Sequence, residues 1–277
     1  MKIIHISDIH LTVPGEYMGG LDPHARLALA LADVTKNHAD ATRIIITGDL
    51  AHWGERDAYE ALRDAISDLQ VPPVRLMIGN HDDRSTFLSV FTDHPTDAHG
   101  FVNHAETIDG TRFIYLDSVG TRTHAGHFCA DRRAWLQAEL ADCERARIFL
   151  HHNPMHVGLP AEDKIALVEA DRAPFRKIIE TYADKIDYLH FGHVHAPIHG
   201  RFAGVQFASV PSTGNQSIPD LTETDLLQGA PMAPAYFVVL INGDDTTIHQ
   251  IPFAWDGPIL PAGTGWEDWA KPTQAAE

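Results

Sequence analysis

The stretch Arg75-Leu-Met-Ile-Gly-Asn-His-Asp-Asp83 joins a short apolar strand to a tight turn of potential metal ligands. Residues 74–78 have the length and composition of a buried strand. Gly79 then lets the backbone turn sharply, and an amide, an imidazole and a carboxylate follow at once. In open α/β sheets, ligands bind beyond the carboxyl ends of the strands. A plain surface turn is the alternative interpretation, because Gly, Asn and Asp all favour turns.

Other predicted strands end in side chains of the same kinds. They are Asp8 and His10 after strand 2–6, Asp49 after strand 43–47, His151 after strand 147–150, and His193 and His195 after strand 186–191. One Asp-x-His or His-x-His pair alone would more often be a surface feature, but surface turns do not readily explain the joint occurrence. Because strand side chains repeat every second residue, we expect the members of each pair to point to one side.

These oxygen and nitrogen donors are suited to two divalent metal ions. The two carboxylate oxygens of Asp49 can bridge two ions, and the set is large enough for a dinuclear centre with ions ~3.5–4 Å apart. Mn, Fe, Zn and Co all accept imidazole and carboxylate ligands. His152 is expected to be a supporting or core residue, because neighbouring strand residues point to opposite faces. The histidines expected to be mostly scaffold or pocket lining are His5, His52, His156 and His190.

Length and composition indicate an ordinary globular protein. The 277 residues suit one large domain or a domain with a small appendage, and 44% are hydrophobic. No stretch approaches the ~18 apolar residues of a membrane span. Met1 and Lys2 lead directly into the first strand without the regions of a signal peptide, and Cys129 and Cys143 suggest a reducing compartment. We therefore expect a cytoplasmic protein.

The charge balance separates classes of partner. Asp and Glu number 38 against 21 Lys and Arg, which gives a net charge of −17. Long nucleic acids require a basic surface, so we do not expect the chain to bind them. The 19 histidines are an unusual number and are a further reason to expect a metal site.

The pattern of elements predicts an α/β fold, either a mixed sheet or two packed mixed sheets flanked by helices. Predicted helices cover 23–37, 55–69, 83–91, 131–141 and 164–183, and the last has a break or restart at Pro174. The later predicted strands cover 101–102, 112–116, 198–202 and 205–210. A loop is predicted at 221–234. A catalytic domain is expected over 1–257, followed by a tail at 258–277. The hairpin at 235–252 leaves a possible sheet edge, which predicts a homodimer or higher assembly.

The ordered motifs resemble those of calcineurin-like metallophosphoesterases over roughly residues 2–215. The matching motifs are Asp8-x-His10, Gly48-Asp49, Gly79-Asn80-His81-Asp82, His151 after a strand, and Gly192-His193-x-His195. Within the family, the chain is most similar to bacterial class III cyclic-nucleotide phosphodiesterases and related glycerophosphodiesterases. Protein Ser/Thr phosphatases instead carry Gly-Asp-x-Val-Asp-Arg-Gly, which reads Gly48-Asp-Leu-Ala-His-Trp-Gly54 here. Their substrate-binding arginine is therefore missing from its motif position.

The resemblance implies a four-layer αββα sandwich and a role for each motif residue. One ion would be held by Asp8, His10, Asp49 and His195, and the other by Asp49, Asn80, His151 and His193. His81 would stand beside the ions and act in catalysis together with the bridging Asp49. The family often has Asp or Asn where this chain has His52, so the resemblance assigns that residue no role.

The implied activity is hydrolysis of small phosphodiesters by a metal-bound hydroxide, with cyclic nucleotides slightly favoured. Glycerophosphodiesters are the first alternative, and a catalytically silent metal-binding regulatory module is the second. Arg84 is the one nearby substitute for the missing arginine, and we expect it on a helix surface. Substrate-binding candidates are Asn80, His81, His52, Trp53 and Tyr17, and Met18, His156 and Asn215 are expected beside them.

Overall fold

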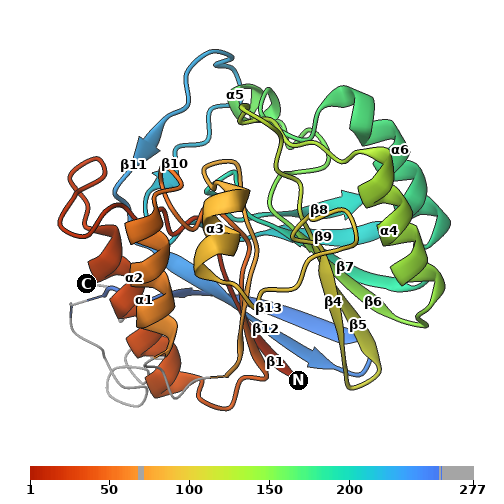
Figure 1. The fold of residues 1–277 in the computed structure, drawn as a ribbon, viewed down its shortest axis with the longest axis horizontal. Coiled ribbons are helices and arrows are strands. Elements are labelled where there is room, and N and C mark those ends of the chain that lie inside the picture. The colour runs from red at the N-terminus through yellow and green to blue at the C-terminus, as the bar shows by residue number, and fades with distance from the viewer. Residues whose placement is uncertain (68–71, 256, 258–277) are drawn as a thin grey trace, which may run out of the picture.

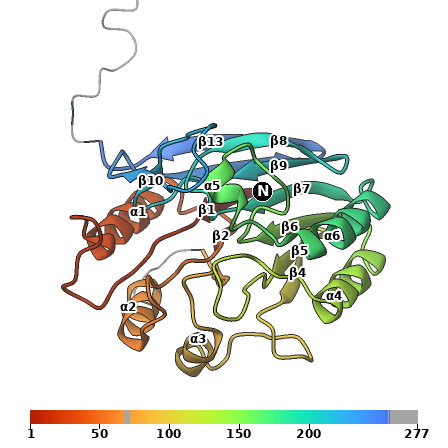
Figure 2. The ribbon, with the colours of Figure 1, turned by 90° about the horizontal axis from the view of Figure 1, so that it is seen from above.

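The computed structural model describes residues 1–67, 72–255 and 257. The predicted tail at 258–277 and the end of the predicted helix 55–69 lie outside these ranges. Two sheets stack face to face at the centre of the molecule (Figures 1 and 2). No helix in the described ranges is long and apolar enough to cross a membrane.

The smaller of the two central sheets has five strands in the order β13-β12-β1-β2-β3. Their bounds are β1 Lys2–Ile6, β2 Arg43–Ile46, β3 Val74–Leu76, β12 Ala235–Asn242 and β13 Asp245–Pro252. β1, β2 and β3 run parallel, and the late hairpin β12–β13 joins antiparallel to β1. β13 is therefore an edge strand, as predicted, whereas Phe237 and Val239 of β12 are buried within the chain. An assembly through this edge remains a prediction.

The larger sheet has six strands in the order β4-β5-β6-β7-β9-β8. Their bounds are β4 His104–Ile108, β5 Thr111–Leu116, β6 Ala146–Leu150, β7 Ile186–Phe191, β8 Ile198–Phe202 and β9 Val205–Ser209. β5, β6, β7 and β9 are parallel to their neighbours, and β4 and β8 close the two edges as antiparallel strands. A separate antiparallel pair consists of β10 Gln216–Ser217 and β11 Gly229–Ala230, and β11 lies within the segment 221–234 expected to be loop.

Helices cover both outer faces, which confirms the predicted α/β architecture of two mixed sheets (Figure 2). α1 Pro23–Asn37, α2 Arg56–Ser67 and α3 Arg84–Val90 lie on the five-stranded side, and α4 Ala130–Ala141 and α6 Glu169–Thr181 lie on the six-stranded side. α1 begins as the sequence indicates. The side chain of Asp22 accepts hydrogen bonds from His24 N and Ala25 N, and Pro23 occupies the first helical position.

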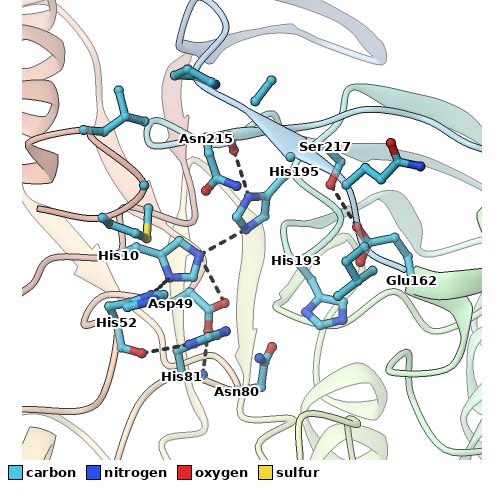
Figure 3. A pocket seen from close by; sticks show the side chains of 18 of the residues that line it. His10, Asp49, His52, Asn80, His81, Glu162, His193, His195, Asn215 and Ser217 are labelled. Carbon is cyan, nitrogen blue, oxygen red and sulfur yellow. Dashed lines mark hydrogen bonds and ion pairs between the residues drawn. The ribbon is translucent and has the colours of Figure 1, made fainter. Parts of the chain in front are cut away.

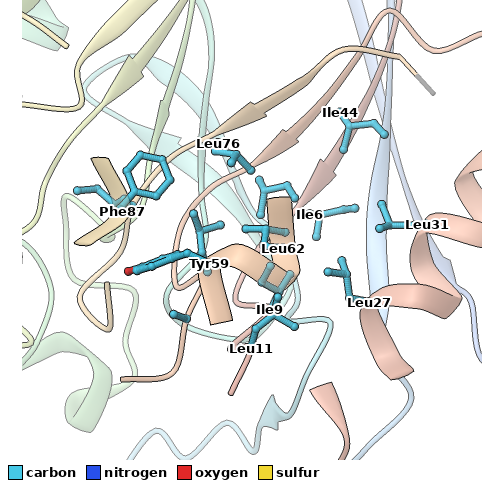
Figure 4. Packing of buried hydrophobic residues seen from close by; sticks show 14 of the residues in the cluster. Ile6, Ile9, Leu11, Leu27, Leu31, Ile44, Tyr59, Leu62, Leu76 and Phe87 are labelled. Atoms are coloured by element: carbon cyan, nitrogen blue, oxygen red, sulfur yellow. The ribbon is translucent and has the colours of Figure 1, made fainter. Parts of the chain in front are cut away.

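Three apolar clusters hold the four layers together. Figure 4 shows the first, in which Leu27, Leu62 and Phe87 pack against Ile6 and Ile44 of the five-stranded sheet. A second cluster lies between the sheets, and a third lies between the six-stranded sheet and its helices. Burial of this apolar surface is the main stabilising force, at about 25 cal/mol per Å² removed from water.

Two local predictions are wrong. The strand paired with β5 is His104–Ile108 rather than 101–102, so the Asp109-Gly110 turn joins directly adjacent strands. The helix expected over 164–183, with a break at Pro174, begins only at Glu169 as α6 and continues through Pro174, and α5 Pro160–Asp163 is a separate short helix before the predicted range. Hydrogen bonds of the intervening segment to Gly126 and Asn153 hold it out of the helix, while the buried face at Phe175 and Ile178 stabilises α6 beyond the proline.

Candidate metal centre

The loops after five parallel strands converge on one edge of the two sheets. We call seven side chains of these loops the donor cluster: Asp8 and His10 after β1, Asp49 after β2, Asn80 after β3, His151 after β6, and His193 and His195 after β7. The loops hold one another, since Asp8 N donates to Gly48 O at 3.1 Å and His10 N donates to Asp49 O at 2.9 Å. The structure thus brings together every residue predicted as a metal ligand.

Much of the donor cluster has a backbone conformation that non-glycine residues rarely adopt. The φ angles are 54° at Asp8, 47° at His10, 48° at Asp49, 68° at His193 and 46° at His195. The prediction that extended backbone aligns the pairs is therefore wrong, because these residues lie past the strand ends in left-handed turns. Such strain persists where the surrounding structure enforces it, typically at functional sites.

Two glycines let the strand ends approach one another. A Cβ on Gly79 would collide with Asp49 Oδ1, and a Cβ on Gly192 would collide with Ser7 Oγ. Asp82, the last residue of Gly79-Asn-His-Asp82, fastens the same loops by accepting hydrogen bonds from Leu50 N, Ala51 N and Gly79 N. This carboxylate is therefore a structural anchor. Burial and the nearby Asp49 raise the pKa of Asp82 to about 6.

The first half of the donor cluster consists of Asp8, His10, Asp49 and His195. Ligand atoms of these four residues all lie within 4.8 Å of one another. His195 Nδ1 donates to Asn215 O at 2.8 Å, which turns Nε2 toward Asp8 Oδ1 at 3.4 Å and His10 Nε2 at 3.1 Å. His10 Nε2 lies 3.6 Å from Asp49 Oδ2. Two imidazole nitrogens and two carboxylate oxygens therefore point to a common space.

The second half contains Asn80, His151, His193 and the other oxygen of Asp49. His151 Nδ1 donates to Thr47 O at 2.9 Å, so that Nε2 faces Asn80 Oδ1 at 3.0 Å and Asp49 Oδ1 at 3.4 Å. His193 Nε2 is buried and has no hydrogen-bond partner in the described part of the chain. Asp49 thus presents one carboxylate oxygen to each half, which is the arrangement a bridging ligand needs.

This donor set fits divalent cations. An unpartnered buried imidazole nitrogen and facing lone pairs are costly unless a cation or proton lies between them. The pKa values of two histidines also show that the site favours positive charge. Burial alone would lower the pKa values of His151 and His195. The nearby carboxylates of Asp49 and Asp8 instead raise both pKa values to about 9. Neutral imidazoles and ionised carboxylates are ordinary ligands of first-row divalent metals.

His152 supports the cluster and has no nitrogen left for a metal. Ser118 Oγ lies 2.8 Å from Nδ1, and Nε2 lies 3.1 Å from His124 O, so both ring nitrogens have partners. The ring does not point away from its neighbour as expected for adjacent strand residues; its centroid lies 5.0 Å from that of His151. β6 ends at Leu150, so strand alternation no longer applies here.

A cavity of about 350 Å³ opens over the donor cluster (Figure 3). His81 and His52 line it as a stacked pair, with ring centroids 5.1 Å apart. His81 Nδ1 donates to His52 O at 2.8 Å, which leaves Nε2 available beside the cluster. Among the other candidates, Met18 and Asn215 also line the cavity.

Some expected pocket residues lie elsewhere. Tyr17 is exposed and does not line the cavity, and Trp53 lines an adjoining groove with Asn80 and His81. His156 pairs with Arg172 instead.

The expectation of a surface Arg84 is wrong: its side chain is about 25% exposed and makes two hydrogen bonds to the buried Asp117, at 2.7 and 2.8 Å. That pairing neutralises the candidate cation that the sequence suggested.

His124 and Glu162 are polar residues at the site that were absent from the predictions. His124 Nδ1 accepts from Asn80 Nδ2 at 2.9 Å, which turns Asn80 Oδ1 toward His151. Glu162 lies in the cavity wall on α5. Neither follows a predicted strand, so the strand-end pattern that identifies the donor cluster could not have found them.

The chain is similar in sequence to known proteins. Residues 1–197 match the family model described as calcineurin-like phosphoesterase. The chain is 36% identical over 265 residues to a probable cyclic nucleotide phosphodiesterase of Rhodopseudomonas palustris, with 94% of this chain and 95% of the relative covered. It is 26% identical over 222 residues to a glycerophosphodiester phosphodiesterase of Enterobacter lignolyticus, with 78% of each covered.

A solved structure shares the fold. The dimetal phosphatase from Danio rerio superposes with a TM-score of 0.67 at 17% identity, covering 90% of this chain and 95% of that one. The family match covers well over half of the chain and includes every residue of the donor cluster. The chain therefore belongs to the calcineurin-like phosphoesterase family.

Proposed function

We propose that this protein is a phosphodiesterase that uses two divalent metal ions to hydrolyse small phosphodiesters, with 3′,5′-cyclic nucleotides as its substrates. One observation carries the proposal: the two carboxylate oxygens of Asp49 face two separate sets of buried donors. Asp8, His10, Asp49 and His195 would hold one ion. Asp49, Asn80, His151 and His193 would hold the other.

The chemistry follows from the charges and the free donors of the site. When bound, two such ions polarise the phosphoryl group and lower the pKa of water, so that a hydroxide nucleophile is available at neutral pH. Asp8 and Asp49 reduce a +4 ion pair to +2, which balances one phosphodiester anion and one hydroxide. The free Nε2 of His81 is placed to stabilise a phosphoryl oxygen or to protonate the leaving alkoxide.

The same count favours diesters over monoesters. A monoester brings up to two negative charges near neutral pH, and good turnover would benefit from an additional fixed cation. Arg84, the substitute cation that the sequence suggested, is already paired with Asp117. Between diester classes, the 36% identity to a probable cyclic nucleotide phosphodiesterase supports cyclic nucleotides over the glycerophosphodiesters of the 26% identical relative.

The test is hydrolysis by metal-free and reconstituted protein. We expect chelation to abolish turnover of bis(p-nitrophenyl) phosphate and of cyclic AMP, and Mn²⁺, Co²⁺, Fe²⁺ or Zn²⁺ to restore it with two ions per chain by elemental analysis. The choice among these metals follows from the activity of each reconstituted form. Full turnover in protein shown to be metal-free would refute the proposal. A tenfold preference for p-nitrophenyl phosphate, about 1.4 kcal/mol in the transition state, would refute the diesterase assignment.

A further inference from the structure

Glu162 places a buried carboxylate in the wall of the catalytic cavity. Glu162 is only 7% exposed. Ser217 Oγ donates to its Oε1 at 2.8 Å (Figure 3), whereas Oε2 has no partner among the residues that the structure describes. Oε2 is not one of the fully buried atoms that lack a partner, so it stays accessible and can accept a hydrogen bond from a ligand in the cavity.

The surrounding contacts hold this carboxylate in place. Asp163, the next residue, accepts hydrogen bonds from Val157 N at 2.8 Å and Gly158 N at 3.0 Å, which fixes the short helix α5. Ser217 N donates to His195 O at 3.1 Å, so the partner of Glu162 is itself tied to the donor cluster. The position of Glu162 relative to the metal centre is therefore set by two independent anchors.

Glu162 is suited neither to the metals nor to the phosphate. None of the groups of potential metal ligands found in the described ranges includes it. A carboxylate repels a phosphoryl oxygen, so it would weaken substrate binding if it faced the phosphodiester itself. What it can bind is a neutral O–H or N–H donor, and such hydrogen bonds to a charged acceptor are the strong ones.

The residues around Glu162 indicate that its hydrogen-bond donor lies close to the phosphate of the substrate. Glu162 shares the cavity with His193 and His195. In a 3′,5′-cyclic nucleotide, the 2′-hydroxyl is on the carbon next to that bearing the 3′-oxygen, so it stays near the phosphoryl group. Ile165 and Leu227 also line the cavity and offer apolar surface suited to the face of a base.

We propose that Glu162 is a specificity-determining residue that accepts a hydrogen bond from the ribose 2′-hydroxyl of the cyclic nucleotide. This inference rests on the proposed phosphodiesterase function. Acidic side chains read ribose hydroxyls in the same way in dinucleotide-binding folds. Ser217 occupies the other oxygen and holds the carboxylate for this contact.

The experiment compares kcat/KM for cyclic AMP, 2′-deoxy cyclic AMP and bis(p-nitrophenyl) phosphate in four proteins. These are the wild type, Glu162→Ala, Glu162→Gln and the control Glu169→Gln, which removes an exposed carboxylate from the neighbouring helix α6. Metal content is measured for each. We expect Glu162→Ala to lose about 10- to 100-fold more on cyclic AMP than on the other two substrates, chiefly through KM. Glu162→Gln keeps an acceptor oxygen and should lose less.

The wild type alone provides a second test, because its kcat/KM for cyclic AMP should exceed that for the 2′-deoxy analogue by about tenfold or more. Equal losses on all three substrates would overturn the inference, because Glu162 would then act through the fold or the metals. Equal losses on cyclic AMP and its deoxy analogue would also overturn it, because the donor would lie on the base. Turnover of bis(p-nitrophenyl) phosphate without any turnover of cyclic AMP would instead refute the proposed substrate class, before the variants are compared.

Discussion

Buried histidines past the ends of β6 and β7 and a buried histidine within β7 have opposite surroundings. At the carboxyl edge of the sheets, His151 and His195 each donate from Nδ1 to a backbone carbonyl and turn Nε2 toward a carboxylate. Between the sheets, His190 of β7 stacks on Phe149, with centroids 4.7 Å apart. Both nitrogens of His190 lack partners within the described ranges.

The difference shows that position relative to the strand end, rather than residue type, decides what these histidines do. Past the strand end, the loops supply carbonyls and carboxylates that orient a ring and leave a lone pair for a cation. Inside β7, backbone groups are used by the sheet, and the ring of His190 only packs against its neighbours.

Asp49→Ala should have the largest effect, because this residue faces both halves of the donor cluster. We expect kcat/KM for bis(p-nitrophenyl) phosphate to fall about 10³-fold or more, with loss of at least one ion per chain. Asp57→Ala, which removes an exposed carboxylate from α2, is the control. Two bound ions and activity within tenfold of wild type would contradict the bridging role.

His81→Ala should lower kcat about 10²-fold and leave both ions bound, because His81 lies beside the cluster rather than in it. Elemental analysis combined with steady-state kinetics separates the two effects. The variant would place His81 among the ligands if it lost an ion in proportion to its loss of activity.

The contrast also explains which parts of the site the sequence could predict. Asp8, Asp49 and His193 directly follow recognisable apolar strands, so pattern and spacing identify them. Their left-handed backbone could not be predicted, because it results from packing between loops that are distant in the chain. Glu162 was missed for the same reason: only the folding of α5 over the cavity and its contact with Ser217 place it there.

The fold shows the same division. Strands and long amphipathic helices follow local periodicity, and the predicted two-sheet α/β architecture is confirmed. The boundary of α6 depends on tertiary hydrogen bonds from Leu167 N to Asn153 O and from Gly126 N to Ala166 O, which no local pattern encodes.

Gly79→Ala should destabilise the edge of the sheets by about 1–3 kcal/mol through overpacking and should weaken metal binding, because its Cβ would collide with Asp49. Gly19→Ala is the matched control: it also lines the cavity, but a Cβ there meets nothing within 4 Å. That control adds only the backbone cost of its positive φ of 56°. Urea unfolding and metal titration of both variants measure the difference. Equal metal affinity in the two variants would show that close approach at Gly79 is not required.

His190→Phe should have the smallest effect and the opposite sign. The ring lies between Phe149 and Tyr188, at centroid distances of 4.7 and 4.9 Å, so an apolar ring of similar shape can replace it. Removing two unpartnered buried nitrogens should raise the free energy of unfolding by about 1 kcal/mol at pH 7.5. Urea unfolding in the presence of a chelator measures this value without a contribution from bound metal.

The pH dependence of that gain tests its cause. Burial, together with His5, Arg147 and His199, lowers the pKa of His190 well below its ordinary value of 6.5. As the pH falls through 6.5, the unfolded chain takes up a proton at this position and the folded chain does not, so the wild type loses stability. The advantage of His190→Phe should therefore grow by about 1.4 kcal/mol between pH 7.5 and pH 5.5. The exposed control His249→Phe should follow the wild type at both values. A constant difference between His190→Phe and wild type across this range would mean that His190 takes up its proton equally in the folded and unfolded chains, and the contrast between His190 and the histidines past the strand ends would fail.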